Sequence, residues 1–171
     1  ASLGAIALGD TDIAESNFLL LAKNQHQNGQ IPIRIGDHFI GLKVLGISLP
    51  QKRLPRYTQD KLNSHPTDQN SLFVIVASEL MKTKSGRELV SKSIPNLDKA
   101  IVWNLAQDLD SDSIMEEGEY STWADSLAKK GKVLYTNVLH CRALYCMSHI
   151  CAALGTKGEA RHYLKLHDQA R

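Results

Sequence analysis

Two segments of the chain are apolar on almost every side of a helix. One is centred on Val74, in "SLFVIVASELM", and the other on Leu144, within a predicted helix from about Leu134 to Leu154. A helix without a polar face must be covered by neighbouring elements on all sides. We therefore expect both helices in the interior of a helical assembly, and this requirement narrows the fold class more than any other feature.

Further helices are predicted around these two. Apolar residues recur at helical spacing from Thr11 to about Gln27, and residues 85–109 predict a short helix and then a longer one, with Pro95 in its first turn. A last helix follows "TKGE" at 156–159, which has the spacing of a capping box. The pattern predicts an all-α fold of about six helices arranged in hairpins. Six helices can barely enclose two fully apolar ones, so we expect part of a larger assembly.

Helix ends and loops are indicated by single residues. Thr67 is the expected N-cap of the helix from Asp68 to about Lys84, and Gly155 is expected to end the helix that begins near Leu134. The stretch "IPIRIG" alternates in polarity and predicts a short extended piece. The segment 51–66 is polar and contains two prolines, so it predicts a long loop, and such loops are often functional.

Composition excludes several classes of protein. The basic residues are scattered and the formal charge is only +2, so we expect no nucleic-acid partner. No apolar run is long enough to cross a bilayer and the first ten residues do not resemble a signal peptide, so we expect a soluble protein without a membrane partner. Three cysteines within one apolar segment favour free thiols and a cytoplasmic protein; a signal removed before Ala1 is the alternative.

An acidic loop carries the most specific metal-like pattern. Asp108, Asp110, Asp112 and Glu119 occupy positions 1, 3, 5 and 12 of a calcium-binding EF-hand loop. Position 6 requires a glycine for its sharp turn, but it is Ser113, and the flanking helices are not typical of an EF-hand. We therefore favour a solvated acidic turn over a calcium site.

Other familiar sites find little support in the sequence. Two histidines and three cysteines lie on the predicted helix between 140 and 151, but no second ligand pair at zinc-like spacing accompanies them, which favours a buried helix. No "GxSxG" nucleophile motif and no phosphate-binding glycine loop occurs. We expect no metal and no cofactor.

A carboxylate in a loop beside aromatic residues suits sugar chemistry. Asp125 lies between Trp123 and Ser126, with Tyr120 close by. Hydrolysis of a glycosidic bond needs a carboxylic acid and a second carboxylate, while tryptophan and tyrosine offer flat apolar surface for a pyranose ring. Shielding by Trp123 would raise the pKa of Asp125, as a general acid requires. The alternative is that Asp125 caps a helix or pairs with Lys129 or Lys130.

These residues also carry a resemblance. "STWADSLAKKGKVLYTNVLHCRAL", together with "PTDQNSLFVIVASELMKTKSGRELVSKSIPNLDKAIVWNL" and "NQHQNGQIPIRI", resembles the six-hairpin (α/α)6-barrel glycosidases, above all the amylo-α-1,6-glucosidase domain of glycogen-debranching enzymes. Trehalases, neutral invertases and glucoamylases are more distant relatives in this resemblance, which covers roughly residues 10–155.

The resemblance implies roles for individual residues. Asp125 falls on the "TWxD" segment that carries a catalytic acid, and Trp123 is the neighbour that contacts the sugar. Asp68 matches a carboxylate that contacts the sugar or acts as the acid in some relatives, and Arg34 falls where a substrate-binding arginine sits. Tyr135 stands where debranching-type members commonly have glutamate, which leaves the linkage open.

The resemblance also implies a ring of about twelve helices, of which residues 1–171 form about half. The second catalytic carboxylate would then come from the remainder of the barrel, supplied by the same or another chain. The leading hypothesis is inverting hydrolysis of an α-glucosidic or related bond in an oligosaccharide or polysaccharide. The rivals are a non-catalytic carbohydrate-binding or scaffold module and a helical-repeat interaction protein; the repeat protein is disfavoured because no self-similarity at a fixed period is visible.

Overall fold

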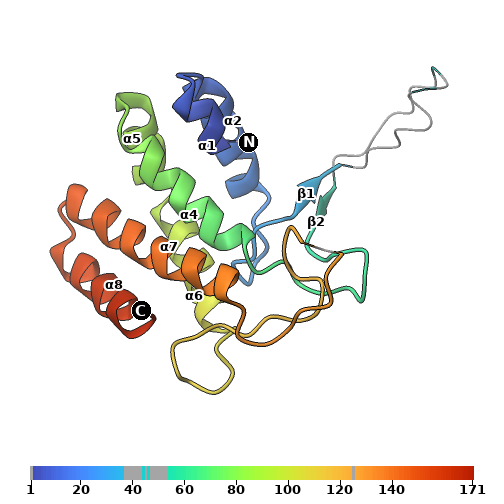
Figure 1. The fold of residues 1–171 in the computed structure, drawn as a ribbon. Helices are drawn as coiled ribbons and strands as arrows, with labels where there is room; N and C mark the ends of the chain where they lie inside the picture. Colours follow the sequence, from blue (N-terminus) through green and yellow to red (C-terminus); the bar gives the residue numbers. More distant parts are fainter. Residues whose placement is uncertain (1, 37–43, 45, 47–53, 125) are drawn as a thin grey trace.

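The computed structural model describes residues 2–36, 44, 46, 54–124 and 126–171 (Figure 1). The chain is mostly helical, as the sequence predicts. The helices are α1 (Ser2–Ala7), α2 (Thr11–Lys23), α4 (Gln69–Leu80), α5 (Lys84–Lys92), α6 (Ile94–Leu105), α7 (Leu134–Ala153) and α8 (Lys157–Gln169). Within the described part, no helix combines the length and apolarity needed to cross a membrane.

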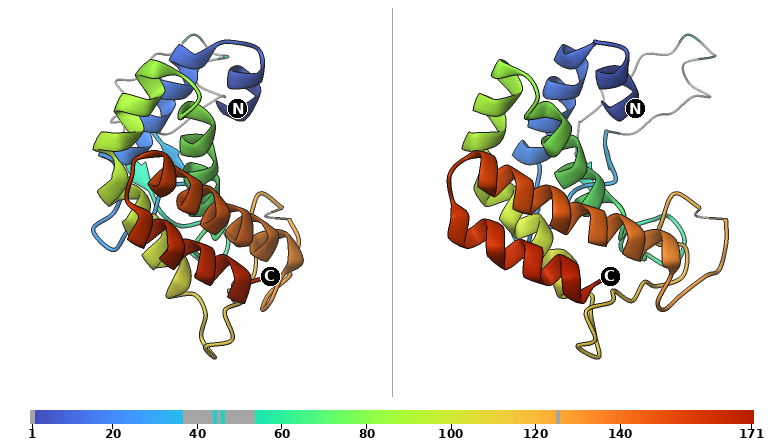
Figure 2. Two further views of the ribbon diagram at one scale, coloured as in Figure 1. Left: turned by 90° about the vertical axis from the view of Figure 1, so that its left-hand side faces the viewer. Right: turned by 60° about the vertical axis from the view of Figure 1, so that its left-hand side comes forward.

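Helix α4 lies at the centre of the molecule. It packs against α1 and α2 on one side, against α7 on another, and against α5 and α6 as well. Three helix pairs follow one another in space, namely α1 with α2, α4 with α6, and α7 with α8. In Figure 2, left, α4 lies between α1 and α7 in one row of helices, and α2, α6 and α8 form a second row beside it. Two of these pairs, α1 with α2 and α7 with α8, are consecutive in the chain, whereas α5 lies between α4 and α6.

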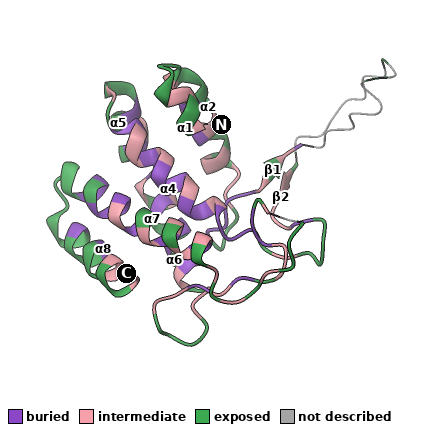
Figure 3. Ribbon diagram, viewed as in Figure 1, coloured by how far each residue is buried: buried purple, intermediate pink, exposed green. Residues whose placement is uncertain are grey.

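The two apolar helices form the core. Val74 on α4 and Leu144 on α7 are completely buried, and most buried side chains of the bundle come from these helices and from α6 (Figure 3). The rings of Phe18 on α2 and Phe73 on α4 stack with their centroids 4.5 Å apart. The predicted burial is confirmed for α4, which has no exposed residue, whereas α7 keeps an exposed side that includes Leu134 and Val138.

One buried amide joins three parts of this core. The side chain of Asn70 accepts a hydrogen bond from the Ile31 N–H (2.8 Å) and donates to the carbonyls of Gly29 and Ala100, both at 3.1 Å. Gly29 has a positive φ of 98°, and a Cβ there would lie 2.1 Å from the Lys99 carbonyl oxygen. Only glycine fits this approach, so the turn after α2 is fixed against α6.

A small sheet follows this turn. Strands β1 (Arg34–Ile35) and β2 (Pro55–Arg56) are antiparallel, with Arg34 opposite Arg56 and Ile35 opposite Pro55. The extended piece predicted for "IPIRIG" is confirmed. The long loop predicted for 51–66 needs a correction, because β2 lies within it and pairs with β1 across a large sequence separation; residues 51–53 fall outside the described residues.

Several helix ends differ from the prediction. Thr67 does not cap α4, because its hydroxyl donates to Glu117 instead. Asp68 occupies the N-cap position, and its side chain makes no capping bond. Helix α4 ends at Leu80 rather than near Lys84, since Thr83 caps α5 by accepting from the Gly86 N–H at 3.0 Å. Gly155 ends α7 with φ 86°, as predicted.

Candidate functional site

The long connections gather at one end of the bundle, beside the N-terminal ends of α4 and α7 (Figure 1). One of them, residues 117–131, is closed at its base by two backbone hydrogen bonds between Glu117 and Gly131, of 2.9 and 2.8 Å. We call it the tryptophan loop because it carries Trp123. The neighbouring segment 57–66 contacts it through Gln59, whose side-chain amide donates to the Thr122 carbonyl at 3.3 Å.

Two residues singled out from the sequence meet at this loop. Asp68 is 1% exposed, and its Oδ2 accepts from the backbone N–H of Trp123 (3.2 Å) and from the hydroxyl of Tyr135 (3.4 Å). The side chain of Trp123 itself is 73% exposed, and its ring meets that of Tyr135 edge-on with centroids 6.3 Å apart. An exposed aromatic surface therefore lies beside a buried carboxylate.

Burial determines the protonation of this pair. Removal from water raises the pKa of Asp68 above its usual range; the hydrogen bonds from Trp123 and Tyr135 oppose this change, and the negative charge of Glu117 adds to it. Burial, together with the charge of Asp68, raises the pKa of the Tyr135 hydroxyl to about 12. Tyr135 therefore remains a hydrogen-bond donor to Asp68 at neutral pH, while Asp68 takes up a proton more readily than an exposed aspartate.

A second buried carboxylate, Glu117, completes the cluster. Its side chain is fully buried; Oε2 accepts from the hydroxyls of Thr67 (3.1 Å) and Thr136, and Oε1 lies 3.1 Å from the Lys129 ammonium. Lys129 also donates to the Thr122 hydroxyl at 2.8 Å. Glu117 could not be singled out by aromatic neighbours in the sequence, which were the feature that pointed to Asp125. The signal left unused is the pair of threonines, each at the beginning of an apolar helix.

The other predicted residues have separate positions. Asp125 lies outside the described residues, although its neighbours in the tryptophan loop are described. Tyr120, in the same loop, has a positive φ of 61°, and the Lys61 ammonium lies 4.8 Å from its ring centroid. Arg34 is on β1, 3.9 Å from the Asp60 carboxylate, which Arg56 also contacts. The structure thus brings Asp68 and Trp123 together and places Tyr120 and Arg34 beside residues of segment 57–66.

The acidic loop does not have the arrangement of an EF-hand. The Lys132 ammonium lies 2.7 Å from Asp110 and 2.5 Å from Asp112, while Asp108 accepts the backbone N–H groups of Asp112 and Ser113. Glu119, at the twelfth position, lies 3.9 Å from Lys130 instead. Lys132 therefore compensates part of the negative charge of this loop, in which carboxylate oxygens of Asp108, Asp110 and Glu116 lie within 4.8 Å of one another.

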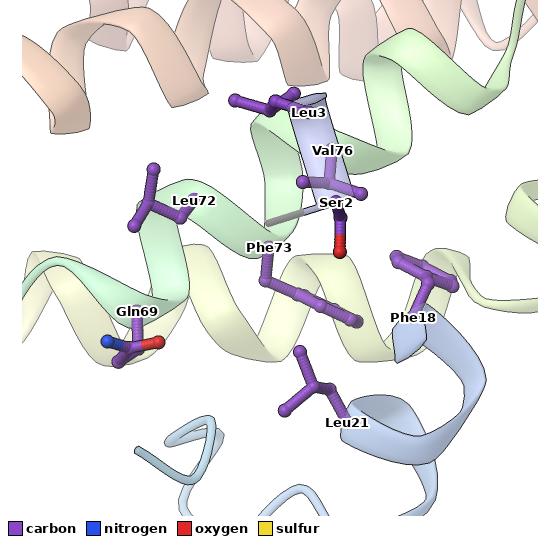
Figure 4. A pocket seen from close by; sticks show the side chains of 8 residues that line it. All are labelled: Ser2, Leu3, Phe18, Leu21, Gln69, Leu72, Phe73 and Val76. Atoms are coloured by element: carbon purple, nitrogen blue, oxygen red, sulfur yellow. The ribbon is translucent and has the colours of Figure 1, made fainter. Parts of the chain in front are cut away.

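A hollow of about 200 Å³ lies away from these loops, between α1, α2 and α4 (Figure 4). Its lining is largely apolar and includes the stacked rings of Phe18 and Phe73. The residues around it are Ser2, Leu3, Phe18, Leu21, Gln69, Leu72, Phe73 and Val76. This lining contains no titratable group, so the hollow offers no acid or base for chemistry.

Comparison with models of known protein families gives no match for the chain, and comparison with curated proteins gives none either. The resemblance to six-hairpin glycosidases therefore remains a prediction from the sequence, and the site has to be interpreted from its own geometry.

Proposed function

We propose that the chain is part of a glycoside hydrolase of the six-hairpin type and that it binds a saccharide at Trp123 and Asp68. The observation that carries this proposal is the exposed Trp123 ring, whose own backbone N–H is bonded to a buried carboxylate. A pyranose ring stacks on tryptophan through its apolar face, while carboxylates bind its hydroxyls or transfer protons to its glycosidic oxygen. Tyr135, edge-on to Trp123, extends the aromatic surface.

The proposed reaction is hydrolysis with inversion of an α-glucosidic or related bond. In this proposal Asp125 protonates the leaving oxygen, and Asp68 binds the sugar. The exchanged assignment, with Asp68 as the acid, is supported by the raised pKa of Asp68, because a general acid must hold its proton near neutral pH. An inverting enzyme needs a second carboxylate to activate water from the opposite side of the sugar, and we propose that the remainder of the barrel supplies it.

The helix pairs support the proposed ring. A barrel of this type is built from consecutive helix pairs. Here the pair α4 with α6 lies between the pair α1 with α2 and the pair α7 with α8. Apolar side chains on α1, on α2 and in the turn between them are exposed, namely Leu3, Leu8, Ile13, Leu19 and Leu20. We propose that further helices of the ring, from the same or another chain, cover this face.

Activity tests the catalytic assignment. Asp125→Asn in the complete protein should abolish the release of reducing sugar from α-glucans while the far-UV circular dichroism and the melting temperature stay unchanged. Asp68→Asn, which keeps an oxygen to accept from Trp123, should also reduce turnover. Glu119→Gln is the matched control in the same loop. An Asp125→Asn enzyme with full turnover would remove Asp125 from the mechanism.

A non-catalytic carbohydrate-binding module is the second candidate. The observation that favours it is the burial of both Asp68 and Glu117, each of which is already occupied by donors from the protein. A module of this kind would bind oligosaccharides at Trp123 without releasing reducing sugar, and Asp125→Asn would leave the affinity unchanged. A measured turnover that depends on Asp125 would decide for the hydrolase.

A further inference from the structure

We propose that Glu117 is the positioning residue of this site, and that its buried carboxylate holds Asp68, Trp123 and Tyr135 in their relative places. This inference deepens the proposed function and rests on it for the role of the three residues. It concerns a group that does not face the saccharide itself. Glu117 has a fully buried side chain and acts through the residues that bond to it.

The first connection runs to Asp68. The Thr67 hydroxyl donates to Glu117 Oε2 at 3.1 Å, and Thr67 directly precedes Asp68 in the chain. The backbone N–H of Thr67 donates to the Ser121 carbonyl at 2.9 Å, within the tryptophan loop. Both the hydroxyl and the backbone N–H of Thr67 therefore hold the start of α4 against the tryptophan loop.

The second connection runs to Trp123. Lys129 lies 3.1 Å from Glu117 Oε1 and donates to the Thr122 hydroxyl at 2.8 Å, and Thr122 directly precedes Trp123. The backbone of Glu117 closes the same loop against Gly131. Glu117 therefore fixes both the base of the tryptophan loop and the residue beside its exposed aromatic ring.

The third connection runs to Tyr135. The Thr136 hydroxyl, in the first turn of α7, donates to Glu117 Oε2, and Thr136 directly follows Tyr135. Each group bound by Glu117 is thus a chain neighbour of a site residue or, in the case of Lys129, bonded to the chain neighbour of one. A single buried carboxylate that joins three segments leaves little freedom in the distances between them, which is what a preorganised site requires.

The charge of Glu117 gives this role a measurable signature. The titratable groups that act on Asp68 are Glu117 from the tryptophan loop and Tyr135 from α7, and Lys129 lies beside Glu117. The negative charge of Glu117 raises the pKa of Asp68, and Lys129 compensates part of that charge. Removing Glu117 should therefore lower the pKa of Asp68, whereas removing Lys129 should raise it.

The experiment follows Asp68 in the full chain without any saccharide. The ¹⁵N and ¹H shifts of the Trp123 amide, which bonds to Asp68, are recorded against pH in the wild type and in Glu117→Gln and Lys129→Met. We expect the midpoint to move down by about half a unit or more in Glu117→Gln and to move up in Lys129→Met. Glu119→Gln, the same charge change at a half-buried position of the loop, should leave it in place.

Two further readouts separate positioning from stability. In a Trp103→Phe background Trp123 is the remaining tryptophan, and its fluorescence anisotropy should fall in Glu117→Gln as the loop loosens. Thr67→Val, which removes one donor only, should give a smaller fall and serves if Glu117→Gln does not fold. A folded Glu117→Gln protein with an unchanged midpoint and unchanged anisotropy would overturn the inference.

The outcome can be told apart from that of the proposed function. If the midpoints move in opposite directions but malto-oligosaccharides do not bind to the wild type, the positioning arrangement stands and the saccharide proposal fails. If malto-oligosaccharides bind equally well to the wild type and to Glu117→Gln, and the midpoint is the same in both, the positioning inference fails while the saccharide proposal stands.

Discussion

Acid should destabilise the fold through one buried histidine. His140 on α7 is 1% exposed, and its Nδ1 lies 3.4 Å from the side-chain amide of Asn104. Burial lowers the pKa of His140 from 6.5 to about 4. The unfolded chain therefore binds a proton at this residue before the folded protein does. Stability from the neutral form is complete above pH 6.5 and is lost as the pH falls from there to about 4.

The size of this loss follows from the two pKa values. One unit corresponds to about 1.4 kcal/mol, so the full difference is worth about 3 kcal/mol, of which about 2 kcal/mol is lost between pH 8 and pH 5. Asp68 acts in the opposite direction: because its pKa is raised in the fold, it contributes stability as the pH falls through its folded value. Asp68 therefore offsets part of the loss at the acidic end of the range.

Urea denaturation followed by circular dichroism measures this effect at pH 8, 7, 6 and 5. The free energy of unfolding of the wild type should fall by about 2 kcal/mol more than that of His140→Gln over this range. The exposed His162 provides the control, and His162→Gln should follow the wild type. A difference in unfolding free energy between the wild type and His140→Gln that is the same at every pH would show that His140 does not cause the acid destabilisation.

Two further predictions concern the core around α4. Gly29→Ala should lower the free energy of unfolding by about 2 kcal/mol or more, since φ is positive and the new Cβ would meet the Lys99 carbonyl. Gly158→Ala is the control, because there is open space around it, and it should be neutral or stabilising in a thermal melt. Asn70→Ala should cost about 3 kcal/mol or more in urea denaturation, because it leaves three buried backbone groups without their partner. A loss below 1 kcal/mol at Asn70 would contradict this account of the core.

The helices could be predicted because their signal is local. An apolar stretch around Val74 or Leu144 indicates by its own composition that these residues are buried. Gly155 ends α7 because it adopts a positive φ, which glycine favours. Strand β2 could not be predicted in this way, since two residues become a strand only by pairing with β1. Helix α1 is short, and the sequence reading did not identify it.

The site was predicted only in part for the same reason. The resemblance implied that Asp68 and Trp123 both contact the sugar, and the structure joins them by a hydrogen bond across 55 positions of the chain. Thr67 looked like a cap because serine and threonine at such positions usually bind the first turn of the helix. Its hydroxyl binds Glu117 instead, 50 positions away. A local sequence pattern does not reveal a distant hydrogen-bond acceptor such as Glu117, so neither the bond nor Glu117 could be predicted.

We propose that Trp123 and Asp68 form a saccharide site. A titration of the Trp103→Phe protein with malto-oligosaccharides, followed by the emission of Trp123, tests it most directly. We predict a saturable change in emission and protection of Trp123 from acrylamide quenching, both weakened in Asp68→Asn. An emission spectrum and quenching constant that do not change at any oligosaccharide concentration, in a folded protein, would contradict the claim.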